Sequence, residues 1–321
     1  MRTTTAKAMA AMTMIIAASF TTAFTTAFTT TGAAQAPAPK PQPPLATLRA
    51  GIERTARSVN ATWGIYIKSI ETGEEIAIDA DRQMDTMSVI KIPLMVEVFE
   101  QIKAGKLSLS EKYTLTAEDV RPGTGIMRSL DAGAVVTLKD LITLMNIVSD
   151  NTATDVLFKK VGGIEPVNAR MKALGLTATR ATGPTSDWFA ALNKAVSPEV
   201  FHREAKTPFG LSTPRETGTL LEMMARKTLV DAKSSDLMLQ IMSGQLYRTR
   251  IPRYLSGYRI PHKTGDFLPY IGNDVGLLMA PGRTIVISIY NANHFGDRDR
   301  LEEAIGDIAR QVAQYYAFRQ P

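Results

Sequence analysis

The chain has 321 residues, of which 45% are hydrophobic and 21% are charged. This balance excludes wholesale disorder and supplies enough apolar residues for a large core. The net charge of +6 comes without a basic run, which argues against nucleic acid as a partner, and the absence of cysteine excludes disulfides and thiol catalysis. Three scattered histidines, His202, His262 and His294, lack metal-ligand spacing, so we expect no metal and no cofactor.

Residues 1–36 have the features of a secretory signal peptide. Arg2 and Lys7 precede a short apolar stretch at 8–20, and Ala36 ends a small-residue cleavage site. That stretch is shorter than the roughly 20 residues of a membrane span, which makes an uncleaved anchor the weaker alternative. Cleavage removes two basic residues and no acidic one, leaving a net charge of +4. The proline-rich segment 37–44 is interpreted as a spacer, and we expect secretion or a bacterial periplasmic location.

The remaining chain, 45–321, predicts strands near both ends and helices between them. The strands are expected at 63–70, 75–78, 259–263, 273–279 and 284–290. The helices are expected at 45–58, 88–104, through most of 137–229, and at 298–318. Thr137 and Thr213 have the features of helix N-caps. We therefore expect an α/β sandwich, with one five-stranded antiparallel sheet built from both chain ends and an inserted all-helical lobe.

Ser88 and Lys91 lie three residues apart at the start of a predicted helix, and therefore on one face of it. If burial and nearby charge lower the pKa of the lysine, its neutral amine can accept the serine proton and create a nucleophile. The helix N-terminus adds N–H groups that stabilise a negative oxygen. Taken alone, the pair is more typical of a capping serine and a surface lysine.

Two further motifs change this interpretation. In Ser149-Asp150-Asn151 the serine can relay a proton to a leaving group, and the asparagine amide can bind a lysine or a substrate amide; alone, these residues are typical helix caps. The segment 263–265, Lys-Thr-Gly, ends a predicted strand, where lysine raises the local positive potential, threonine can bind a carboxylate and glycine leaves room for substrate. The alternative there is a strand followed by a turn.

The order Ser-x-x-Lys, Ser-Asp-Asn, Lys-Thr-Gly resembles the motif set of class A β-lactamases and penicillin-binding proteins. The resemblance to class A β-lactamase-like serine hydrolases covers nearly all of 45–321 and includes 161–163 (Val-Gly-Gly), 212–214 (Ser-Thr-Pro) and 273–276 (Asn-Asp-Val-Gly). It implies a catalytic domain with the site between sheet and helical lobe. It also implies a small β-lactam or peptidoglycan-like substrate. We expect a monomer without a stable membrane span.

The resemblance also implies roles for the residues around the scissile amide. Ser88 is the acylated nucleophile, and Lys91 is its base or proton relay. Ser149 protonates the leaving nitrogen, and Asn151 binds the substrate amide. The backbone N–H groups of Ser88 and Asp266 form the oxyanion hole.

A second set of residues is implied to hold the substrate carboxylate. Lys263 and Thr264 bind it directly, and Gly265 keeps the strand backbone accessible. Many family members add an arginine at one of two positions. Gly272 occupies the first, so Arg250 is the candidate at the second; the alternative is an ordinary surface arginine.

The sequence departs from class A enzymes where they carry the glutamate that activates water. The segment 188–193 keeps the Leu-Asn of the pattern, but Phe189 stands at the glutamate position, and phenylalanine cannot act as a base. Possible substitutes are Asp187, ranked first, then Glu199 and Glu204. Three hypotheses stay open: a β-lactamase that turns over, at an ordinary or a reduced rate; a penicillin-binding D-Ala-D-Ala peptidase; and a receptor that stays acylated.

Overall fold

The computed structural model describes residues 44–205 and 207–317. The predicted signal peptide and nearly all of the spacer lie outside these residues, so both stay predictions. Residues 42–321 form one unit. Within the described part of that unit, no helix has the length and apolarity needed to cross a membrane.

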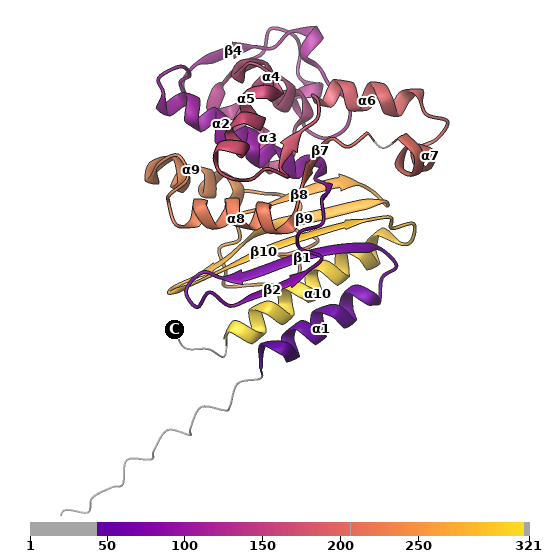
Figure 1. The fold of residues 1–321 in the computed structure, drawn as a ribbon. Helices are drawn as coiled ribbons and strands as arrows, with labels where there is room; N and C mark the ends of the chain where they lie inside the picture. Colours follow the sequence, from indigo (N-terminus) through magenta and orange to yellow (C-terminus); the bar gives the residue numbers. More distant parts are fainter. Residues whose placement is uncertain (1–43, 206, 318–321) are drawn as a thin grey trace, which may run out of the picture. The chain divides into compact units, whose positions relative to one another are not determined.

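The main sheet joins strands from both ends of the chain, which confirms the predicted fold class (Figure 1). Its five strands run in the order β2-β1-β10-β9-β8, and every neighbouring pair is antiparallel. Their bounds are β1 Thr62–Ser69, β2 Glu75–Ile78, β8 His262–Phe267, β9 Ile271–Ala280 and β10 Arg283–Ala292. The two chain ends meet at the β1–β10 pair, where Thr62 lies opposite Ala292 and Ser69 opposite Ile285.

Alternating side chains give the sheet two buried faces. Ile65 and Ile67 of β1 pack with α1 (Leu45–Arg57) and α10 (Arg298–Ala317) in one hydrophobic cluster. Tyr66, between them, belongs to the other cluster, together with residues of α8 (Pro214–Ala225). This period of two is what places one layer of helices on each face.

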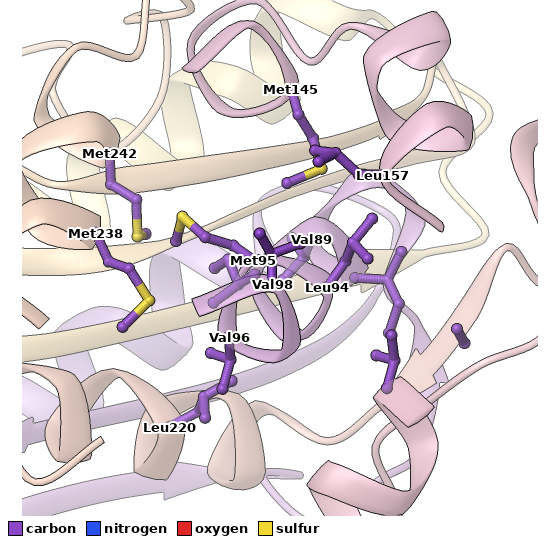
Figure 2. Close-up of a cluster of buried hydrophobic side chains, with 14 of the residues drawn as sticks. Val89, Leu94, Met95, Val96, Val98, Met145, Leu157, Leu220, Met238 and Met242 are labelled. Carbon is purple, nitrogen blue, oxygen red and sulfur yellow. The ribbon is translucent and has the colours of Figure 1, made fainter. Parts of the chain in front are cut away.

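The helical lobe is arranged around α2 (Lys91–Lys103), in which every residue from Lys91 to Phe99 is buried. A helix that is buried all round must be central. Its neighbours include α3 (Leu138–Ile147), α4 (Asn151–Val161) and α5 (Ile164–Ala173). Residues of α8 and of α9 (Ala232–Ser243) belong to the same hydrophobic cluster. Figure 2 shows the apolar side chains of α2, among them Leu94, Met95, Val96 and Val98, with Met145, Leu157, Leu220, Met238 and Met242 around them.

Shorter elements complete the lobe and connect it to the sheet. They are the helices α6 (Thr185–Lys194) and α7 (Pro198–Val200), the turns η1 (Met87–Ile90), η2 (Ala117–Asp119), η3 (Met127–Ser129) and η4 (Phe201–Ala205), and the strands β3 (Met84–Asp85), β4 (Lys112–Thr114), β5 (Val135–Thr137), β6 (Arg180–Ala181) and β7 (Gly210–Ser212). The small strands were not predicted, because two or three residues carry too little alternation to detect. The predicted caps Thr137 and Thr213 are confirmed, since each side chain accepts an N–H from the first turn of its helix.

Two predicted boundaries were wrong. The helix expected from residue 88 begins at Lys91, because a single 3-10 turn, η1, precedes it. The strand expected at 259–263 starts at His262 and continues to Phe267, because a hairpin pairs Phe267 with Ile271 of β9. The Lys-Thr-Gly segment therefore lies inside an edge strand, and not at a strand end.

Candidate active site

Ser88 lies in η1, on a turn that is held in a strained backbone conformation. Met87, the residue before it, has a φ of 45°, which is uncommon for a residue other than glycine. The Met87 N–H donates to the Asp85 carboxylate at 2.9 Å, and the Thr86 N–H donates to the Gly210 carbonyl at 2.9 Å. These contacts leave the partly exposed Ser88 side chain at the wall of a cavity.

Lys91 is fully buried one turn after Ser88, so the interpretation as a surface lysine is wrong. Its Nζ donates to the Ser149 carbonyl at 2.7 Å, to Ser149 Oγ at 3.1 Å and to Asn151 Oδ1 at 2.9 Å. Burial holds the pKa of Lys91 well below its ordinary value, and the positive charge of Lys263 lowers it further. A lysine in this environment gives up its proton readily and can then act as a base.

Ser149 connects the two buried lysines. Its Oγ accepts hydrogen bonds from Lys91 and, at 3.0 Å, from Lys263, and its backbone is left-handed, with a φ of 55°. Asp150 caps α4 by accepting the Ala153 N–H at 2.9 Å. The capping interpretation of this motif therefore holds for Asp150, while the side chains of Ser149 and Asn151 face Lys91.

The Lys-Thr-Gly segment of β8 lies directly against the nucleophile turn. Burial lowers the pKa of Lys263 to about 7. The Thr264 hydroxyl is buried and has no hydrogen-bond partner among the described residues. A Cβ on Gly265 would lie 2.3 Å from the Thr86 carbonyl oxygen, so only glycine lets the strand approach this closely.

Arg250 is 2% exposed, so the interpretation as a surface arginine is also wrong. Its guanidinium pairs with the Asp266 carboxylate, binds the Glu302 carboxylate at 3.2 Å and donates to the Asn273 carbonyl at 2.7 Å. Arg250 does not line the cavity at Ser88. Two carboxylates already engage the guanidinium, and this position does not favour it as a ligand for substrate.

The cavity at Ser88 has a volume of about 280 Å³, a polar edge and an apolar wall. The polar edge includes Ser88, Thr124, Ser149, Asn151, Thr185 and Asp266, and the wall includes Met87, Leu192, Phe209 and Leu268. Trp188 completes the wall through edge-to-face contacts with Phe189 at 5.1 Å and Phe267 at 5.0 Å between ring centroids. Of these aromatic residues the sequence singled out Phe189 alone, because the others belong to no motif.

The three candidate water-activating carboxylates lie away from this cavity. Asp187 is exposed and lines two other depressions. Glu199 is exposed and pairs with Arg203 at 2.9 Å, and Glu204 is exposed. Asp266 is the one carboxylate among the described residues that line the cavity, and it is paired with Arg250. This geometry does not favour any of the three as the base.

Comparison with known proteins agrees with the fold. Residues 47–316 match the beta-lactamase enzyme family. The chain is 26% identical over 286 residues to beta-lactamase VEB-1 of Pseudomonas aeruginosa, covering 83% of this chain and 89% of that protein. A beta-lactamase structure from Sphaerobacter thermophilus superposes with a TM-score of 0.74 at 29% identity, covering 86% of this chain and 99% of the other. The structure of PBP-A superposes with a TM-score of 0.74 at 25% identity, covering 86% and 98%. The chain therefore belongs to the beta-lactamase enzyme family and is a serine β-lactamase-like hydrolase.

Proposed function

We propose that this protein opens the amide of penicillin-type β-lactams through a class A-like acyl-enzyme on Ser88, and that it hydrolyses this acyl-enzyme slowly. The observation that carries the proposal is the buried chain Lys91–Ser149–Lys263 beside a serine at the cavity wall. Two buried lysines with lowered pKa values bind one hydroxyl, an arrangement that can pass a proton through that hydroxyl.

In the proposed acylation, Lys91 accepts the Ser88 proton as Ser88 Oγ forms a bond to the β-lactam carbonyl carbon. The backbone N–H groups of Ser88 and Asp266 stabilise the negative oxygen of the tetrahedral intermediate. When the ring C–N bond breaks, Ser149 donates its proton to the nitrogen and recovers one from Lys91. Lys263 and Thr264 are assigned the substrate carboxylate; both are buried, and the Thr264 hydroxyl has no hydrogen-bond partner among the described residues.

Hydrolysis of the acyl-enzyme is proposed to be the slow step. It requires a base that activates water at the ester, and a general base typically contributes about 10²–10⁴-fold. Phe189 occupies part of the cavity wall. Among the described residues that line the cavity, the one carboxylate is that of Asp266, and it is paired with Arg250.

Peptidase activity on D-Ala-D-Ala ends is the second candidate. It is favoured because PBP-A matches this fold as well as the Sphaerobacter beta-lactamase does, by TM-score. A variant of PBP-A has been solved as an acyl-enzyme complex with penicillin G.

The test is intact-protein mass spectrometry of the chain without residues 1–36, mixed with penicillin G, beside a Ser88→Ala control. We expect a Ser88-dependent adduct that decays over minutes to hours as penicilloate accumulates. An adduct that never decays, with release of D-alanine from a D-Ala-D-Ala peptide, would favour the peptidase. The absence of any adduct would refute the proposed chemistry.

A further inference from the structure

Asn273 on β9 connects the strand that carries Asp266 with the turn that carries Ser88. Its side chain is fully buried. The amide nitrogen donates to the backbone carbonyls of Asp85 at 2.9 Å and Thr86 at 3.2 Å, and the amide oxygen accepts the Asn291 N–H at 3.0 Å. Both amide protons and the amide oxygen are used, so the orientation of this side chain is fixed.

The nucleophile turn needs such a support because its backbone is strained. A left-handed residue such as Met87 costs on the order of 1–3 kcal/mol and persists only where its surroundings hold it. The two carbonyls bound by Asn273 belong to the residues immediately before Met87. Without the amide, the Asp85 carbonyl loses this donor, the Thr86 carbonyl keeps only the Val89 N–H at 3.1 Å, and the turn loses these hydrogen bonds to β9.

Arg250 binds the backbone of Asn273, whose side chain binds the nucleophile turn. Its guanidinium donates to the Asn273 carbonyl at 2.7 Å and pairs with the Asp266 carboxylate. The strand register strengthens this connection, because Asn273 lies opposite Gly265, the neighbour of Asp266. A continuous path of hydrogen bonds therefore runs from Thr86 through Asn273 and Arg250 to Asp266.

We propose that Asn273 is a positioning residue that sets the separation between the N–H groups of Ser88 and Asp266. The inference rests on the proposed function, in which these two groups form the oxyanion hole. Such donors act when they lie about 2.7–3.1 Å from the oxyanion, so a small shift of either segment weakens the transition state. Asn273 does not line the cavity and acts through the backbone of its neighbours.

The test compares Asn273→Ala with Asn146→Ala. Asn146 is a matched control because it is 1% exposed and its amide donates to a backbone carbonyl, that of Ile142 at 2.9 Å, but it lies on α3 in the helical lobe. We expect Asn273→Ala to acylate with penicillin G about 10–100-fold more slowly at saturation, with little change in the half-saturating concentration. Asn146→Ala is expected to lose stability and to keep its acylation rate. Asn273→Ser, which leaves a smaller gap, replaces the alanine variant if that does not fold.

Hydrogen exchange of the unreacted protein gives a second readout that needs no substrate. We expect the amides of 86–90 to exchange faster in the Asn273 variant than in the Asn146 variant at equal global stability. Unchanged exchange there, or equal acylation rates in both variants, would overturn the inference. A wild-type protein that is never acylated would refute the proposed function instead, while the exchange result would still decide the role of Asn273 in holding the turn.

Discussion

Replacing Phe189 with glutamate tests the proposal that residue 189 stands at the position of the class A water-activating base. The ring lines the cavity with Ser88 and Asn151 and packs edge-to-face on Trp188 at 5.1 Å. Removing it forfeits an aromatic pair worth about 0.5–1.5 kcal/mol beyond area burial, so the variant is expected to unfold at a lower temperature. A positioned base is expected to speed acyl-enzyme hydrolysis by about 10²–10⁴-fold, which lowers the barrier by roughly 3–5 kcal/mol.

The assay follows decay of the penicillin G adduct by intact-protein mass spectrometry after excess substrate is removed. Phe189→Gln is the matched control, because it removes the same ring and adds a side chain of similar length that cannot act as a base. Both variants are expected to lose similar stability, and only Phe189→Glu is expected to gain turnover. Equal decay in the two variants would show that residue 189 does not face the hydrolytic water, and the alignment that places it there would be wrong.

Three further outcomes are expected. Acylation should follow a bell-shaped pH profile: it falls at low pH as Lys91 becomes protonated, and it falls as pH rises through about 7, because Lys263 loses the charge that binds the substrate carboxylate. Lys263→Arg should move the alkaline limb upward, and a profile unchanged by this substitution would assign that limb to another group. Gly265→Ala should slow acylation by about 10²-fold, which is the effect of misplacing one oxyanion donor. The reason is that the new Cβ would lie 2.3 Å from the Thr86 carbonyl oxygen and push β8 away from the nucleophile turn. A normal rate would show that β8 can move away without cost. A penicillin with a carboxylate on its acyl side chain should acylate Ser88 at least about tenfold more slowly than penicillin G does. The cavity wall formed by Trp188 and Phe267 offers that carboxylate no cation. Equal rates would place the acyl side chain of the penicillin outside the cavity.

The sequence alone determined the fold class and named the candidate reactive residues. Strand alternation and the division of strands between the chain ends led to the five-stranded sheet, because side-chain period and chain order are local properties. Ser88, Lys91, Ser149 and Lys263 could be named because three short motifs with fixed spacing accompany one another. Burial of Lys91 could not be derived from Ser-x-x-Lys alone, since the same spacing also fits an exposed helix start.

Only the tertiary structure decided which residues surround this centre. Trp188 and Phe267 belong to no spacing pattern and reach the cavity at Ser88 through contact between segments far apart in the chain. Asn273 stands in the 273–276 segment, but that pattern does not indicate that its amide binds the Thr86 carbonyl. Arg250 illustrates the same limit, because its two carboxylate partners lie 16 and 52 residues away and no local pattern indicates that they engage it. Positions fixed by long-range packing depend on how helices and strands approach in space, and the periodicity of a single segment carries no information about that approach.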